Sequence, residues 1–128
     1  MTREDKILLL TDLCARLPYH VRCKIWLEDG TTEEGPLDLQ HNYGDVLRDA
    51  FFYHDRIKDI KPYIRPMSSM TEEEKLMYEG LMIGTDNVSY MLDVIDWLNK
   101  RMFDFRGLIP KDLAISTEEF NPYNIKAQ

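Results

Sequence analysis

The chain has 128 residues, which fits one domain with one hydrophobic core, predicted to span residues 1–128. With 44% hydrophobic and 30% charged residues, the composition is that of a globular protein and excludes an intrinsically disordered chain. The formal net charge of −7 disfavours a general nucleic-acid binder, because such proteins neutralise phosphates with clustered lysine and arginine.

The compartment is predicted from the N-terminus and the cysteines. Acidic residues lie close to the N-terminus, and Thr11 and Asp12 interrupt the apolar run 7–10, so neither a secretory signal nor a membrane span is expected. Cys14 and Cys23 both occupy positions of an apolar pattern, which predicts buried thiols in a reducing compartment and no disulfide framework. We therefore expect a cytoplasmic protein without membrane association.

Residues 1–18 are predicted to form a helix that Thr2 caps and Pro18 ends. The apolar residues of this segment recur at intervals of three and four, which is the spacing of one buried helix face. They are Ile7, Leu10, Leu13, Cys14 and Leu17.

Residues 19–66 are predicted to form the β region of an α+β fold. From position 20 the apolar period changes to two, the pattern of a half-buried antiparallel strand. The inward side chains are Val21, Cys23, Ile25 and Leu27. Asp29 and Gly30 predict a turn, and further extended segments are expected around Gly35–Gln40, Val46–His54 and Arg56–Ile60. The result is a small antiparallel sheet of three or four strands, which could close into an SH3-like barrel.

The segment KPYIRPMSSMTEEEK is predicted to join the sheet to the helices. Pro62 and Pro66 cannot donate ladder hydrogen bonds, so strand pairing should end near Ile60. Thr71 and Glu74 have the spacing of a capping box, and the three consecutive glutamates occupy a first helical turn, where the helix dipole favours negative charge. The segment is therefore interpreted as a structural joint and a helix N-terminus.

Residues 67–128 are predicted to form two helices and a C-terminal tail. The later helix, opened by a cap at Asp86, has a core stripe within one sector of the helical wheel. The stripe consists of Val88, Met91, Leu92, Ile95, Leu98 and Met102. A second ridge lies off that stripe and has the composition of a binding hot spot. It consists of Tyr90, Val94, Trp97 and Arg101.

Two interpretations of the second ridge remain open. In one, the C-terminal segment FDFRGLIPKDLAIS folds back over Trp97, because its own apolar residues also need cover. In the other, the ridge binds a protein partner or forms a symmetric homodimer.

No catalytic signature is found in the sequence. The phosphate loop, the dinucleotide fingerprint, the nucleophile elbow and the HExxH motif are all missing. His20 and Cys23 form a lone HxxC without a second pair at zinc-site spacing, so neither a metal site nor a cofactor is expected. His41 and His54 stand near aspartates and could act as a base with its orienting carboxylate, but solvated turn residues fit the pattern better.

One basic group could bind phosphates despite the overall charge. Residues 1–66 carry ten basic and twelve acidic groups, whereas residues 67–128 carry six and eleven, so the N-terminal half is the less acidic. The group surrounds a tyrosine and has Arg22 and Lys24 on a neighbouring strand, a combination that could hold phosphates and stack a base. It consists of Arg56, Lys58, Lys61, Tyr63 and Arg65. An ordinary solvated strand edge is the other interpretation.

Three blocks, LCARLPY (13–19), IKPYIRPMSSMTEEEK (60–75) and FDFRGLIPKDLA (103–114), resemble an uncharacterised family of small proteins from anaerobic gut bacteria and their phages and mobile elements. Asp112 stands where the family is expected to have glycine. The resemblance implies an accessory gene carried by phages or mobile elements, and it carries over no catalytic residue.

We therefore predict a non-enzymatic protein-interaction module that modulates a host or defence factor. The stretch between Val21 and Arg56 looks like the part that varies among the resembling proteins. Catalytic residues would have to survive that variation, so a variable sheet region suits recognition better than catalysis. The alternative is a small-barrel nucleic-acid or nucleotide-binding protein that uses residues 56–65.

Overall fold

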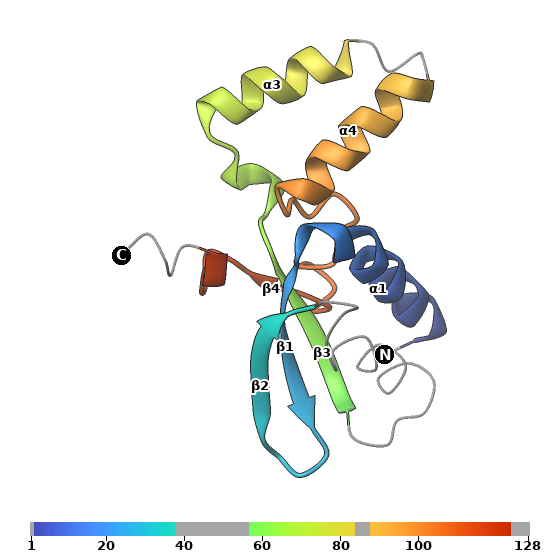
Figure 1. The fold of residues 1–128 in the computed structure, drawn as a ribbon, viewed down its shortest axis with the longest axis vertical. Coiled ribbons are helices and arrows are strands. Elements are labelled where there is room, and N and C mark those ends of the chain that lie inside the picture. Colours follow the sequence, from blue (N-terminus) through green and yellow to red (C-terminus); the bar gives the residue numbers. More distant parts are fainter. Residues whose placement is uncertain (1, 38–56, 84–87, 124–128) are drawn as a thin grey trace.

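A computed structural model describes residues 2–37, 57–83 and 88–123 (Figure 1). An N-terminal helix, a four-stranded sheet and two later helices confirm the predicted α+β class. In chain order the elements are α1 (Arg3–Arg16), η1 (Leu17–Tyr19), β1 (Arg22–Leu27), β2 (Thr32–Pro36), β3 (Ile57–Ile64), η3 (Met67–Ser69), α3 (Glu72–Met82), α4 (Val88–Lys100) and β4 (Ile115–Ser116). None of these described helices is long and apolar enough to cross a membrane. The predicted strand at Val46–His54 and the predicted cap at Asp86 lie outside the described residues.

The four described strands form an open, mixed sheet in the order β2-β1-β3-β4. β1 pairs antiparallel with both β2 and β3, as predicted, whereas β4 pairs parallel with the end of β3. The chain passes through both C-terminal helices before it reaches β4, and such a long crossover is what a parallel pairing requires. The sheet is therefore not purely antiparallel, and its described strands do not close into a barrel.

β1 has the alternation that its sequence predicts. Its inward residues Cys23 and Ile25 are buried and pack with Leu9 and Leu13 of α1 in the main hydrophobic core. Burial raises the pKa of the Cys23 thiol, as expected for a core cysteine. The inner face of the sheet is thus the face that α1 covers.

The turn after β1 also forms as predicted. Asp29 Oδ1 accepts the Thr31 N–H at 2.9 Å, and Gly30 has a φ of 90°, a value that glycine adopts without strain. Because β2 follows this turn directly, it begins at Thr32, earlier than the predicted segment Gly35–Gln40.

The buried face of α1 is rotated from the predicted one, and Ile7 and Cys14 are exposed. The buried residues of the helix are Leu9, Asp12, Leu13 and Arg16. Asp12 and Arg16 form an ion pair at 2.9 Å, and Arg16 also donates to the carbonyl oxygen of Phe103 at 2.7 Å. The buried face of α1 therefore includes an ion pair that contacts the chain after α4. The spacing of apolar residues gives no signal for a buried face that is partly charged.

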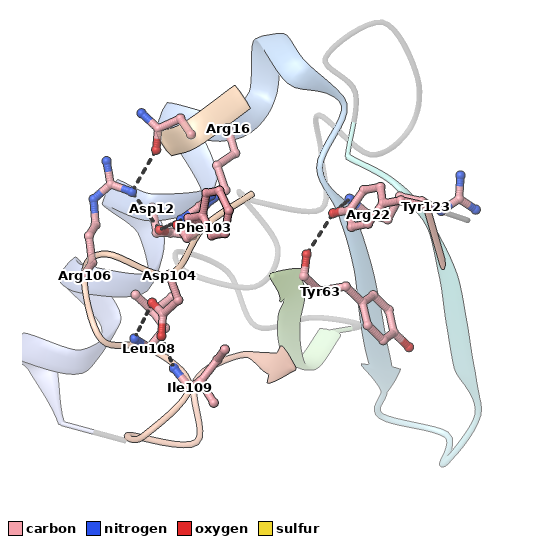
Figure 2. Close-up of polar contacts among 11 residues, drawn as sticks. Asp12, Arg16, Arg22, Tyr63, Phe103, Asp104, Arg106, Leu108, Ile109 and Tyr123 are labelled. Carbon is pink, nitrogen blue, oxygen red and sulfur yellow. Dashed lines mark hydrogen bonds and ion pairs between the residues drawn. The ribbon is translucent and has the colours of Figure 1, made fainter. Parts of the chain in front are cut away.

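A second arginine extends this buried network (Figure 2). The Arg106 guanidinium donates to Asp12 Oδ1 at 2.7 Å. In the same segment, Asp104 accepts the N–H groups of Leu108 and Ile109 at 2.8 and 2.9 Å and so shapes the turn that returns the chain to the sheet. These charge-assisted bonds hold the segment after α4 against α1.

β3 continues through Pro62 to Ile64, so the prediction that pairing ends near Ile60 is wrong. The carbonyl oxygen of Tyr63 is bonded on the β1 side, and that of Ile64 accepts an N–H on the β4 side. Since backbone groups alternate along a strand, the Pro62 nitrogen also points to the β4 side. β4 begins opposite Tyr63, so no described strand lies opposite Pro62 on that side. The missing N–H of Pro62 therefore leaves no ladder acceptor without its donor.

A tyrosine from the C-terminal segment completes the ladder between β1 and β3 (Figure 2). Tyr123 Oη accepts the Arg22 N–H at 2.9 Å and donates to the carbonyl oxygen of Tyr63 at 2.8 Å. Burial raises the pKa of the Tyr123 phenol, which keeps the hydroxyl protonated and able to donate. One hydroxyl therefore satisfies two backbone groups that would otherwise lack partners at the end of the sheet.

Removal of this hydroxyl should destabilise the fold. We expect Tyr123→Phe to lower the free energy of unfolding by about 1–3 kcal/mol, because it leaves two buried backbone groups unsatisfied. Tyr90 is exposed on α4, so Tyr90→Phe should change the value by less than about 0.5 kcal/mol. Urea unfolding at neutral pH measures both, and equal effects of the two variants would contradict the bridging role of Tyr123.

Candidate functional site

Arg65, immediately after β3, connects the sheet to the segment that follows α4. Its N–H donates to the carbonyl oxygen of Met102 at 2.6 Å, and its own carbonyl accepts the Asp104 N–H at 2.7 Å. Its guanidinium lies over the Phe103 ring, 4.2 Å from the ring centroid. Both the backbone and the side chain of Arg65 are therefore held in place before the side chain reaches α3.

The Arg65 side chain ends on Glu74 of α3. Nη1 and Nη2 donate to the two carboxylate oxygens at 2.8 and 2.7 Å, a bidentate pair. The predicted capping box is also present: Thr71 Oγ1 accepts the Glu74 N–H at 3.1 Å, and the Glu74 carboxylate accepts the Thr71 N–H at 2.9 Å. Glu74 thus caps the helix and ties it to the sheet, as the joint interpretation requires.

The electrostatics of this joint favour a charged Glu74. The hydrogen bonds from Arg65, which outweigh desolvation, lower the pKa of Glu74 from 4.5 to about 2. Arg101, immediately after α4, adds a weaker contact at 3.3 Å to the same carboxylate. One buried carboxylate therefore connects β3, α3 and α4.

A cavity of about 710 Å³ lies beside the joint. Arg65, Glu74 and Arg101 line it, together with Tyr19 from the N-terminal part of the chain and Thr117 from the C-terminal part. Tyr19 Oη is bonded to a carboxylate of α4, and the two arginines are bonded to Glu74. Three of the six charged residues that line the cavity, Arg65, Glu74 and Arg101, are thus engaged in holding the helices.

Two of the four residues of the predicted ridge, Val94 and Trp97, pack inside the molecule. Val94 is buried, and Trp97 stacks on Tyr78 of α3 and on Phe103, with centroids 6.1 and 5.7 Å apart. The Arg101 guanidinium lies over Trp97 at 5.4 Å. The C-terminal segment therefore does fold back over Trp97, and of the four ridge residues Tyr90 and Arg101 keep the most exposed side chains.

The core stripe predicted on α4 is only partly buried, so the prediction is wrong for the first turns of the helix. Leu98 and Met102 are buried, but Val88, Leu92 and Ile95 are exposed, with 61% of Leu92 accessible. The reason is the arrangement of the elements: α3 and α4 project beyond the end of the sheet, so only the C-terminal end of α4 meets α1 and the chain that follows it (Figure 1). The first turns of α4 have no described element beneath their apolar stripe.

α3 and its C-cap also carry exposed apolar side chains. Leu76 is 70% exposed and Ile83 is 86% exposed. Of the eleven large apolar side chains that are exposed among the described residues, eight belong to this pair of helices and a ninth, Ile83, is the C-cap of α3. We call these nine the hairpin surface: Leu76, Met77, Met82, Ile83, Val88, Tyr90, Met91, Leu92 and Ile95.

Negative charge borders the hairpin surface. α3 and α4 together contain six carboxylates and two lysines, and Glu74 is the only one of the six that is buried. The exposed acidic groups are Glu72, Glu73, Glu79, Asp93 and Asp96, and the lysines are Lys75 and Lys100. The hairpin therefore presents apolar side chains within an acidic surround.

The basic group predicted to bind phosphates is not gathered on one surface. Arg65 is bound to Glu74, and Tyr63 is buried and donates its hydroxyl to a carboxylate at 2.7 Å. Lys58 is exposed, whereas Lys61 is half-buried, and Arg56 lies outside the described residues. The four described residues of the group therefore do not form one anion site as a set.

The other chemical candidates are also dispersed. Cys23 is buried on the inner face of the sheet, whereas His20 is exposed, so the HxxC residues do not converge. His41 and His54 lie outside the described residues. Within the described ranges no three potential metal ligands come together.

Comparison with known proteins adds no family or function. The chain matches no protein-family model, no curated protein and no solved structure. The candidate site is therefore argued from the sequence and structure of this chain alone.

Sequence reasoning missed two features of the surface. The exposure of Leu92 and its neighbours depends on how far the hairpin extends beyond the sheet, and periodicity carries no signal for that. The second feature is Trp26, which shares the outer face of the sheet with Lys24 and Lys61. The sequence does contain a signal for this feature: Lys24 and Trp26 occupy the outward positions of the period-two pattern in β1, which places both on the outer face of the sheet.

The joint should make stability depend on pH. The pKa of Glu74 in the folded chain lies below the ordinary value, so its stabilising effect is complete above about pH 5 and is lost as the pH falls from about 4.5 toward 2. We expect Glu74→Gln to lower the free energy of unfolding by about 2–3 kcal/mol at pH 7 and by progressively less below pH ~4.5.

Glu73→Gln is the matched control, because Glu73 is exposed in the same helical turn. It should cost less than about 0.5 kcal/mol at neutral pH. Denaturant unfolding of the three proteins between pH 7 and pH 3 measures the differences. A Glu74→Gln penalty that stays constant over this range would contradict the joint.

Proposed function

We propose that the protein is a non-enzymatic interaction module that binds another protein through the hairpin surface. The observation that carries the proposal is the concentration of nine of the eleven exposed large apolar side chains, among the described residues, on α3, its C-cap Ile83 and α4. Single apolar residues are normal on a protein surface, but a patch of several neighbouring ones marks an interaction site.

The composition of the hairpin surface suits a protein partner. Met77 and Met91 have flexible, polarizable side chains that adapt to a partner's shape. Tyr90 lies off the apolar stripe of α4 and adds an exposed side chain of a type that is enriched in binding hot spots. Complete burial of one leucine such as Leu92 contributes about 1.5–3 kcal/mol, so a few side chains of this kind can supply the central affinity of an interface.

The charge around the hairpin surface favours a partner that is basic. The exposed groups of α3 and α4 are five carboxylates and two lysines, and the whole chain has a net charge of −7. Two copies of this chain would repel one another, whereas a segment that combines apolar side chains with lysine or arginine would be attracted. We therefore propose a basic amphipathic segment of another protein as the occupant.

The joint supports this function by fixing the position of the hairpin. Arg65 holds Glu74 in a bidentate pair, and the stack of Tyr78, Trp97 and Phe103 fills the space between the helices. A surface that is already held in its binding geometry loses less entropy on association. The phage or mobile-element setting and a role in modulating a host or defence factor are proposed only from the resemblance of the three sequence blocks.

A site-specific photo-crosslinker tests the proposal. It is placed at Leu92 and, as a control, at Ile7, which has a similar exposed fraction of 56% but lies on α1. In cells of the organism that encodes the protein, we expect a discrete cross-link to another protein from position 92 and none from position 7. The cross-linked protein is then identified, purified and titrated against the wild-type chain.

In that titration, Leu92→Asp should weaken binding at least tenfold, about 1.4 kcal/mol, whereas Ile7→Asp should change it less than twofold. The dissociation constant should rise with salt, because the proposed partner segment is basic and the hairpin is acidic. The proposal is contradicted by cross-links only between copies of this chain, by no cross-link from position 92, or by equal effects of the two substitutions.

A further inference from the structure

The outer face of the sheet, opposite the face that packs against α1, carries a groove of about 590 Å³. Side chains from β1, β2 and β3 form its floor, and the segment 109–120 forms its opposite wall. Its charged and aromatic lining residues are Lys24, Trp26, Glu34, Lys61, Tyr63, Asp112, Glu119 and Phe120. This groove is separate from the hairpin surface and shares no residue with it.

Two lysines in this groove stand directly opposite one another. Lys24 of β1 pairs with Lys61 of β3 in the antiparallel register, and like charges in that position repel. Lys61 has a carboxylate partner, Asp112, at 3.0 Å, but Asp112 has a side chain that is 91% exposed. Lys24 makes no ion pair with another described residue: Glu34 of β2 stands opposite it in the other register, but the Glu34 carboxylate accepts the Tyr63 hydroxyl. An anion between the two ammonium groups would remove this repulsion.

Trp26 provides a flat apolar surface next to the two lysines. The ammonium groups of Lys24 and Lys61 lie 5.3 and 5.7 Å from the centroid of its ring. Cation–π contacts at exposed sites are weak, and lysine side chains are flexible, so the ammonium groups can move from the ring to a phosphate. The indole face then becomes available for stacking.

The remaining walls of the groove are already in place. Tyr63 is held by a 2.7 Å hydrogen bond from its hydroxyl to Glu34, which also keeps that carboxylate turned toward the tyrosine. Phe120 packs against Tyr63 with centroids 5.6 Å apart and is itself 45% exposed. Glu119 is exposed at the rim. A second aromatic ring is therefore exposed beside the groove that Trp26 lines.

We infer that this groove binds a nucleotide, with a phosphate between Lys24 and Lys61 and a base stacked on Trp26. Lysine ammonium groups together with an aromatic platform are the combination by which proteins hold phosphates and unpaired bases. The nucleotide can be free or can be one residue of a single strand, and the two sources share this chemistry. The inference is independent of the proposed protein partner, which uses a different surface.

Nuclear magnetic resonance titration with adenosine monophosphate tests the inference, because the protein has two tryptophans with separate indole signals. We expect the Trp26 indole signal to shift and the signal of Trp97, whose indole nitrogen is buried, to stay in place. Lys24→Gln and Lys61→Gln should each weaken binding at least fivefold. Lys75→Gln, which removes an exposed lysine on α3, should change it less than twofold.

Further probes separate the contributions of base, phosphate and strand. Adenosine without phosphate should bind at least fivefold more weakly, and polyglutamate should not shift the Trp26 signal. The groove is assigned to single strands if a ten-residue oligothymidylate binds more than tenfold tighter than thymidine monophosphate. It is assigned to free nucleotides if the two affinities are similar.

Three results would overturn the inference. They are no shift of the Trp26 signal up to about 10 mM adenosine monophosphate, equal binding of polyglutamate, and a Lys75→Gln effect as large as that of Lys24→Gln.

Discussion

The bidentate pair between Arg65 and Glu74 is the interaction on which the arrangement of this protein depends. It joins the end of β3 to the first turn of α3, while the same arginine stacks on Phe103. Removing one partner of this partly buried pair leaves the other charge without compensation, at the cost of about 2–3 kcal/mol expected for Glu74→Gln. The position of α4, the packing of Trp97 and the direction in which the hairpin projects all follow from it.

This joint also explains why a large apolar surface can remain exposed on a folded chain. The hairpin is held by a polar joint at its base and by a small aromatic cluster between its helices, so its outer apolar residues contribute little to its attachment. Leu92 and Ile83 can therefore be selected for contact with a partner. The sheet face that carries Trp26 likewise contributes little to the hydrophobic core, because that core lies on the opposite face of the sheet.

Local signals predicted much of the fold. The capping box of Thr71 and Glu74 and the alternation of β1 depend on neighbours close in sequence, and both are confirmed. The failures are non-local. Pro62 is tolerated within β3 because no described strand needs its missing donor, and the buried face of α1 is set by Asp12 and its arginines, one of them 94 residues away. Neither fact is encoded in a short pattern.

The candidate site was predictable only in part for the same reason. The two faces of α4 were recognised, but which face is covered depends on where the helix meets the rest of the chain. Hydrogen–deuterium exchange of Arg65→Gln tests the central claim most directly. If the joint fastens the hairpin, amides of α3 and α4 should exchange at least tenfold faster than in the wild type, with amides of β1 and β3 unchanged. Unchanged exchange in the hairpin, or an equal acceleration throughout the chain, would contradict it.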